Sequence, residues 1–154
     1  LPLEAVVNHF TTYSHNFWLN RATPRLHPSN GAKASTYAHY MLLSDSIRPY
    51  YTLPLAPRIV STVLRFRLGA HCLPVCRDRH QTIPRAQRVC RKCDSGIVGD
   101  ELHMVYECTH LHGLRTQYNH LFTPNMSMKE FFCQSDQHGV ARFIHCALYH
   151  MDTP

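Results

Sequence analysis

The chain has 154 residues, of which 44% are hydrophobic and only 17% charged, so we expect a packed core and exclude a disordered, solvating chain. The formal net charge is +6, and no apolar run approaches the length of a bilayer span, so no membrane partner is expected. The seven cysteines are an odd number without a preceding secretory leader. This favours an intracellular compartment, nucleus or cytoplasm, and a metal over a disulfide framework.

The first part of the chain, residues 1–57, is expected to be a helical segment broken by prolines. Apolar side chains recur at helical spacing over residues 3–20, and a second helix fits residues 35–43. The stretches 21–33 and 49–57 contain two and three prolines, which is typical of loops and linkers. The chain begins with a leucine where an initiator methionine would stand, so we expect a piece of a longer polypeptide.

A third helix is predicted over residues 58–68. Pro57 suits its first position, where the missing N–H would have no intrahelical partner. Gly69 is expected to end it, because glycine adopts the left-handed C-cap conformation without steric cost. The inward positions are Ile59, Val63 and Phe66, with Leu64 left open as a fourth, and the outward ones are Arg58, Arg65 and Arg67. Residues 70–88 show no period and contain two prolines, so we expect an irregular segment there.

The most specific signal in the chain is the spacing C-x2-C-x9-H-x4-C between residues 90 and 108. Three thiolates and one imidazole are a ligand set that structural zinc takes in tetrahedral geometry. The two-residue gap lets the first two thiolates reach one ion from a tight turn, which Asp94-Ser95-Gly96 supplies. We therefore predict a Zn²⁺ site, the alternative being ordinary buried cysteines. Its ligands would be Cys90, Cys93, His103 and Cys108.

The second half of this motif carries a geometric requirement. Positions five apart on an α-helix lie roughly 140° apart around the axis, so His103 and Cys108 would not share a face. A helix that ends before Cys108 removes the difficulty. Asp100 and Glu101 are expected either to orient the second ring nitrogen of His103 or to act as acidic residues at a helix N-terminus. Other ligand-type residues remain open as alternatives: Cys72, Cys76, His80, His110 and His112.

The C-terminal part is predicted to be helical as well. An apolar stripe runs from Leu111 to Phe122 and stops at Pro124. Ser127 and Glu130 have the spacing of a capping box at the start of a short helix. The last helix is expected to begin near Gln137. Two cysteines beside apolar stripes are predicted to be core thiols, Cys133 and Cys146.

Strand signals are poor throughout, so the expected fold is mostly α, with short helices packed around one core and a central C2HC zinc-stabilised turn. Three parts are expected to pack as one compact unit. They are a helical N-terminal segment over 1–57, a basic zinc-binding module over 58–116 and a C-terminal helical segment over 117–154.

Positive charge is concentrated beside the predicted zinc turn. Between Arg58 and Lys92 there are nine basic residues, eight of them arginine, and one acid. Guanidinium groups grip phosphate in a bidentate manner, so this segment favours a nucleic-acid partner bound on one positive surface. The residues expected on that surface are Arg77, Arg79, Arg85, Arg88, Arg91 and Lys92.

Motifs for catalysis are missing from the sequence. It has no phosphate-binding glycine loop, no serine-hydrolase elbow and no paired aspartates of the kind that hold two magnesium ions. A zinc ion with four protein ligands also lacks an open position for water. We therefore expect that this chain is not an enzyme, and a metal-dependent hydrolase is the least favoured interpretation.

Over residues 58–116 the order and spacing of several residues resemble the zinc-binding C-terminal region of non-LTR retrotransposon reverse transcriptases. The resemblance is carried by Arg65-Phe-Arg67-Leu-Gly69-Ala-His71, Leu73-Pro74, Arg79, Arg88-Val-Cys90-x2-Cys93 and Asp100-Glu101-x-His103-x4-Cys108. It implies metal ligation by the C2HC residues, and nearby arginines that contact element RNA or target DNA downstream of an RNA-directed DNA polymerase domain. The catalytic aspartates of that polymerase lie outside this sequence. The competing hypothesis is a zinc-stabilised protein-interaction scaffold that does not bind nucleic acid.

Overall fold

The computed structural model describes residues 53–153. The helices predicted over 3–20 and 35–43 therefore lie outside the described residues. Within 53–153 the chain is built from short helices, and its extended pairing is limited to one antiparallel bridge between Val89 and Val98. The predicted mostly α fold is confirmed. In this part of the chain, none of the helices combines the length and the apolar character that a membrane span requires.

Helix α3 (Pro57–Arg67) begins and ends where the sequence predicts. Pro57 occupies its first turn, and Gly69 follows it with a φ of +66°. The Gly69 N–H donates to the Phe66 carbonyl over 3.0 Å, and the Ala70 N–H donates to the Arg65 carbonyl over 2.8 Å. This pair of bonds is a Schellman motif, which satisfies two terminal carbonyls and turns the chain away from the helix axis.

One residue of α3 was assigned to the wrong face. Arg67 was predicted to face outward, but it is only 2% exposed, and its guanidinium carbon lies 5.1 Å from the ring centre of Phe132. An arginine can be buried in this way because its planar cation is attracted to the aromatic face. The short helix after Gly69, α4 (Pro74–Arg77), lies in the segment that was predicted to be irregular.

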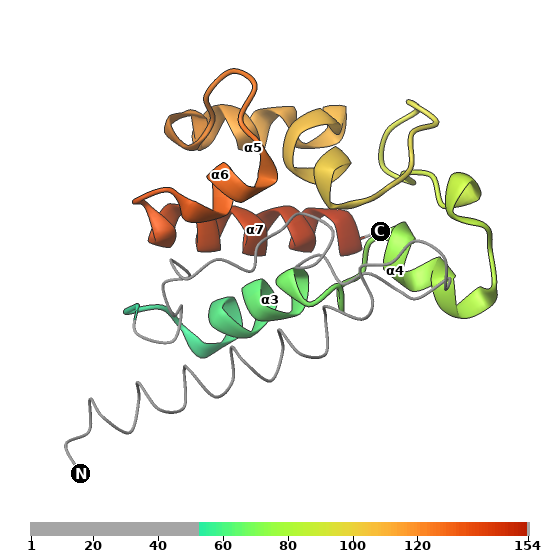
Figure 1. Cartoon of the computed structure of the whole chain (residues 1–154), viewed down its shortest axis with the longest axis horizontal. Helices are drawn as coiled ribbons and strands as arrows, with labels where there is room; N and C mark the ends of the chain where they lie inside the picture. The colour runs from blue at the N-terminus through green and yellow to red at the C-terminus, as the bar shows by residue number, and fades with distance from the viewer. Residues whose placement is uncertain (1–52, 154) are drawn as a thin grey trace, which may run out of the picture.

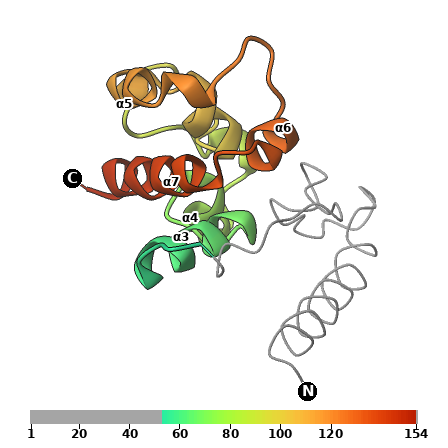
Figure 2. The same cartoon turned by 90° about the vertical axis from the view of Figure 1, so that its left-hand side faces the viewer.

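Helix α7 (Gln137–Asp152) lies between α3 on one side and α5 (His112–Gln117) and α6 (Met128–Cys133) on the other (Figures 1 and 2). The core is formed where these helices face one another. Burying each large apolar side chain of this kind contributes about 1.5–3 kcal/mol. Fully buried core side chains are Val63, Phe66, Phe131, Phe143 and Ile144. The core thus fixes α7 as the element against which the rest of the described chain packs.

The last two helices, α6 and α7, begin at the residues that the sequence predicts. Ser127 Oγ accepts the N–H of Glu130, and the Glu130 carboxylate accepts the N–H of Ser127, which completes the capping box of α6. Helix α7 begins at Gln137 as expected, with Asp136 accepting the N–H of Gly139 over 2.8 Å.

Two predictions in this region are wrong in detail. The stripe from Leu111 to Phe122 is divided into two 3₁₀ turns and the short helix α5, because the Tyr118 N–H bonds both the Leu114 and Arg115 carbonyls and the helix tightens there. Cys133 is exposed and Cys146 is half-buried. Since Phe131 and Phe132 fill the core-facing positions of α6, Cys133 is turned outward.

Candidate metal centre

The first two cysteines of the motif lie on a loop that is closed at its base. The Cys90 N–H donates to the Ile97 carbonyl and the Gly99 N–H to the Arg88 carbonyl, each over 2.8 Å. Gly99 is required at this crossing, because a Cβ there would lie 2.8 Å from Pro74 Cγ and 3.1 Å from the Cys90 Cα. Gly96 turns the tip with a φ of +67°. The loop therefore presents Cys90 and Cys93 in the same direction.

The other two residues are brought together by an unusual helical turn. His103–Glu107 form a π-helical turn, and the Cys108 N–H donates to the His103 carbonyl over 2.7 Å. A bond between residues five apart stacks Cys108 beneath His103, which an α-helix could not do. The helix then ends, since Cys108 has φ −58° and ψ 116°. The expected helix end at Cys108 is confirmed, while the π turn was not predicted.

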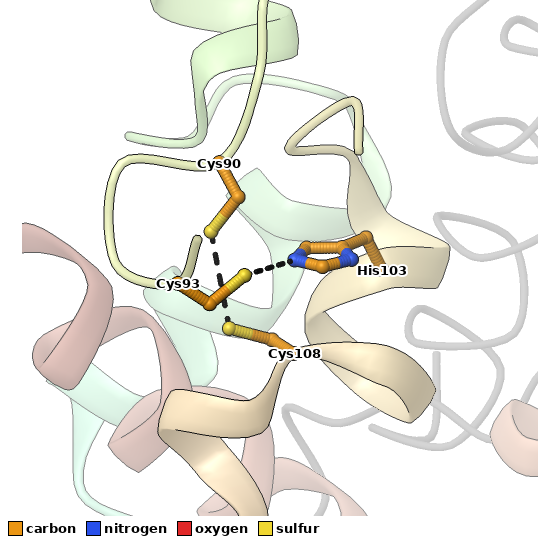
Figure 3. Close-up of side chains that lie close together, drawn as sticks. All are labelled: Cys90, Cys93, His103 and Cys108. Carbon is orange, nitrogen blue, oxygen red and sulfur yellow. Dashed lines mark hydrogen bonds between the residues drawn. The ribbon is translucent and has the colours of Figure 1, made fainter. Parts of the chain in front are cut away.

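The four side chains converge on one point (Figure 3). Their ligand atoms all lie within 4.8 Å of one another. The Cys90 and Cys108 sulfurs are 3.8 Å apart, and the Cys93 sulfur lies 3.3 Å from His103 Nε2. Two thiolates bound to one tetrahedral ion at about 2.3 Å would have sulfurs about 3.8 Å apart, whereas a disulfide requires about 2.05 Å. This spacing fits a metal site, and the predicted ligand set is brought together as a whole.

Burial and neighbouring groups shift the pKa values of two thiols in the cluster in opposite directions. Burial and the neighbouring Cys90 sulfur raise the pKa of the Cys108 thiol to about 12. Burial also disfavours the Cys93 thiolate, but hydrogen bonds from Ser95 outweigh it and lower the pKa of Cys93 to about 6. Three buried or half-buried sulfurs of this kind can all become thiolates when a divalent cation neutralises them.

Polar groups around the cluster hold the ligands in position. Glu107 Oε2 lies 3.4 Å from His103 Nδ1, the ring nitrogen that faces away from Cys93. Asp100 Oδ1 accepts the backbone N–H of His103 over 3.0 Å, and Glu101 contacts His71. Of the two roles left open for Asp100, the helix N-terminal one is therefore correct. Glu107 instead orients the imidazole of His103. The four-residue spacing between these two residues could have indicated this contact.

Arg115 is a further residue that the sequence did not indicate. Its guanidinium donates to the carbonyl of Cys108 and, over 3.3 Å, to the carbonyl of Met104. Met104 lies within the π turn and Cys108 directly follows it, so both bonds reach the backbone of this turn. Arg115 thus joins α5 to the turn that carries two of the four ligands.

A second cluster of ligand-type residues consists of His71, Cys76 and Glu101. His71 Nε2 lies 2.8 Å from Glu101 Oε1 and 3.5 Å from the Cys76 sulfur, and the Cys76 thiol donates to the Gly69 carbonyl over 3.1 Å. Burial lowers the pKa of His71, but the contacts with Cys76 and Glu101 outweigh it and raise the pKa to about 9. Glu101 and Cys76 thus share His71 Nε2, whereas His71 Nδ1 is buried and has no hydrogen-bond partner within residues 53–153.

The residues left open as alternative ligands lie outside the C2HC cluster. Cys76 belongs to the second cluster, and the thiol of Cys72 faces the Leu148 carbonyl at 3.7 Å. The remaining three are exposed, namely His80, His110 and His112.

The six residues predicted to bind nucleic acid all lie in the described part of the chain, and most of them make internal contacts. Three guanidiniums pair with aspartates over 2.6–2.7 Å: Arg77 with Asp152, Arg85 with Asp100, and Arg91 with Asp78. Their side chains remain 46%, 52% and 55% exposed. The Arg77–Asp152 pair is exposed on both sides and contributes about 0–1 kcal/mol, so an incoming phosphate can compete for Arg77. The side chains of Asp100 and Asp78 are only 17% and 2% exposed, so Arg85 and Arg91 are held by carboxylates that water screens less.

The other three residues are less accessible. Arg88 donates to the carbonyls of Ile83 and Val75 over 2.8 and 2.9 Å. The bond to Val75 ties α4 to the base of the loop that carries Cys90 and Cys93, which we call the metal loop (residues 88–99). Lys92 donates to the carbonyl of Thr153 at the end of α7. Arg79 is half-buried, and its Nε has no hydrogen-bond partner within residues 53–153. Arg88 is therefore a structural residue as well as a basic one.

Comparisons with models of protein families, with curated proteins and with solved structures find no match to this chain. The resemblance to the zinc-binding region of non-LTR reverse transcriptases consequently depends on the residues quoted above.

Proposed function

We propose that this chain is a zinc-stabilised module that binds RNA or DNA and belongs to the C-terminal end of a non-LTR retrotransposon reverse transcriptase. The observation that supports it best is the convergence of Cys90, Cys93, His103 and Cys108, with the metal-type spacing of 3.8 Å between two sulfurs. In the sequence this cluster begins where the arginine-dense segment ends, and both lie within residues 58–116, which resemble that family.

Zinc is the metal that this donor set favours. Thiolate and imidazole ligands select soft or borderline ions, and four protein ligands in tetrahedral arrangement are typical of structural zinc. The bound ion would join the loop of Cys90 and Cys93 to the π turn of His103 and Cys108. Its binding energy would act as folding energy for residues 88–108, because the ligands are contributed by two separate segments. A site closed by four ligands serves structure, so the catalytic step would belong to an upstream polymerase domain.

The nucleic-acid function is supported by the arginines whose ends remain half-exposed. Arg91 lies between Cys90 and Cys93, Arg77 ends helix α4, and Arg85 pairs with Asp100, which also caps the π turn. Zinc would hold these segments rigid, so that cations on them meet one phosphate track. Such a module would act in the nucleus or in a cytoplasmic ribonucleoprotein that contains the element RNA.

The test is metal analysis of the purified chain followed by titration with labelled single- and double-stranded RNA and DNA. We expect one zinc per chain and an affinity that falls linearly on a log–log plot as salt rises. Arg85→Ala and Arg91→Ala should each reduce the salt slope by about one without lowering the zinc content. A flat response to both RNA and DNA at about 0.15 M salt would show that the nucleic-acid proposal is wrong.

A second candidate function is a protein-interaction scaffold. It is favoured by the internal pairing of the arginines and by exposed apolar side chains in and beside the metal loop. These are Val89, Ile97 and Leu102, which are 36%, 46% and 38% exposed. On this alternative the zinc content stays at one per chain while nucleic acid is not bound at physiological salt, so the same titration separates the two functions.

A further inference from the structure

The last turn of α7 carries an unusually exposed aromatic side chain. Tyr149 is 66% exposed, the highest value among the large apolar and aromatic side chains of the described residues. Its ring centre lies 6.1 Å from that of His150, and His150 lies 6.4 Å from His110, with the rings nearly perpendicular in both pairs. All three residues are exposed. His110 follows Cys108 by two residues, so these rings form a surface that leads from α7 to the metal centre.

Two cations contact the same turn. Arg77 pairs with Asp152 over 2.6 Å, and Lys92 donates to the carbonyl of Thr153. Thr153 in turn bonds back to Tyr149 and His150, its N–H donating to the Tyr149 carbonyl over 3.0 Å and its Oγ1 to the His150 carbonyl over 3.2 Å. Both cations therefore contact the end of the helix whose last turn carries Tyr149 and His150.

Exposed rings beside cations match the chemistry of an unpaired polynucleotide. Its phosphates are attracted to lysine and arginine, and its bases offer flat faces that stack on aromatic side chains. In a duplex those faces are already stacked on each other, so a duplex could use only the cations. An acidic protein surface would likewise use the cations and leave the rings without a partner.

From this arrangement we infer that Tyr149, His150 and His110 form a stacking platform for unpaired nucleobases, with Arg77 and Lys92 contacting the adjoining phosphates. The inference rests on the proposed function and adds to it in two ways. It names single-stranded nucleic acid as the ligand, and it places the base contacts at the C-terminal end of α7, in addition to phosphate contacts along the arginine-rich segment.

The experiment uses the full chain with zinc bound and an oligouridylate that carries one 2-aminopurine, with a matched duplex as the second probe. Tyr149→Ala should weaken binding of the single strand by about tenfold, the scale of one lost base stack, and should leave duplex binding unchanged. Tyr149→Phe should retain the affinity, because the ring and not the hydroxyl makes the stack. Quenching of 2-aminopurine on binding should be present in the wild type and in Tyr149→Phe, and reduced in Tyr149→Ala.

Arg85→Ala is the matched cation control, since Arg85 is a similarly exposed arginine that pairs with Asp100 and not with the end of α7. It should leave the quenching unchanged, whereas Arg77→Ala should lower both the affinity and the salt slope. If Tyr149→Ala binds the single strand as tightly as the wild type, the platform is wrong while the proposed function stands. If the wild type binds neither probe, both are wrong, and the exposed rings would be left for a protein partner.

Discussion

The two clusters of ligand-type side chains in this fold both contain cysteine and histidine, but their polar atoms make different contacts. In the C2HC cluster, three sulfurs and one imidazole nitrogen face one another at 3.3 and 3.8 Å. In the second cluster, His71 and Glu101 are 2.8 Å apart, and the Cys76 thiol has the Gly69 carbonyl as its acceptor. The first separation suits two ligands of one metal ion, and the second suits a direct hydrogen bond.

This difference shows that proximity of cysteine, histidine and glutamate does not by itself define a metal site. A cluster needs no metal ion when its groups can donate and accept hydrogen bonds among themselves. His71 Nε2 lies within hydrogen-bond distance of both Glu101 and Cys76, so these contacts need no ion. Three thiols and one imidazole contain few good acceptors for such a network, and their spacing suits a metal ion.

The largest effect is expected from removing a ligand of the C2HC cluster. Cys108→Ser should lose the metal and unfold residues 88–108, because structural zinc contributes about 10–16 kcal/mol in small zinc-binding peptides. Cys76→Ser, in the second cluster, should retain one zinc per chain. Metal content by mass spectrometry and the circular dichroism of both variants test this. Full zinc occupancy in a Cys90→Ser, Cys108→Ser double variant would show that the ligands are elsewhere.

Because of the second cluster, the free energy of unfolding should fall as the pH rises into the alkaline range. The pKa of His71 rises from 6.5 in the unfolded chain to about 9 in the folded one, so the folded state binds the proton more tightly. The stabilisation is complete below pH 6.5 and is lost as the pH rises through about 9, which amounts to about 3 kcal/mol. Urea unfolding of the zinc-loaded chain across this range measures it. Stability that is constant or rises over that range would contradict a protonated His71.

Replacing Glu101, the carboxylate of the second cluster, tests that cluster independently of the C2HC cluster. Glu101→Gln should destabilise the protein by about 1.5 kcal/mol near pH 6.5, the lower end for a hydrogen bond to a charged group, because the amide still accepts a hydrogen bond. The alkaline decline in stability should largely disappear, while the zinc content should remain one per chain. Two metal ions in the wild type and one in this variant would instead identify the second cluster as a metal site.

The smallest effect concerns the support of the π turn. Arg115→Met keeps much of the side-chain volume but removes the bonds to the Cys108 and Met104 carbonyls, so the zinc affinity should fall by about tenfold. Competition with a chelator gives the affinity directly. Arg142→Met on the exposed side of α7 is the control and should leave it unchanged. Equal affinities in both variants would mean that the π turn holds its shape without Arg115.

The sequence by itself determined the features that depend on neighbours in the chain. The ligand set follows from spacing within nineteen residues, the end of α3 from the conformational freedom of Gly69, and the start of α6 from the Ser127–Glu130 capping box. The stripe of α7 likewise needed only a helical period. Each of these signals is local, because the atoms that interact are a few bonds apart or share one turn.

Only the tertiary structure decided the contacts between distant segments. The pairs Arg77–Asp152 and His71–Glu101 join residues that are 75 and 30 positions apart, and nothing in the spacing of either residue indicates its partner. The same holds for the outward turn of Cys133 and the inward turn of Arg67, which depend on how Phe131 and Phe132 fill the core. The π turn at His103–Glu107 is decided in the same way, because its rare hydrogen-bond pattern is retained where the metal ligands and Arg115 require it.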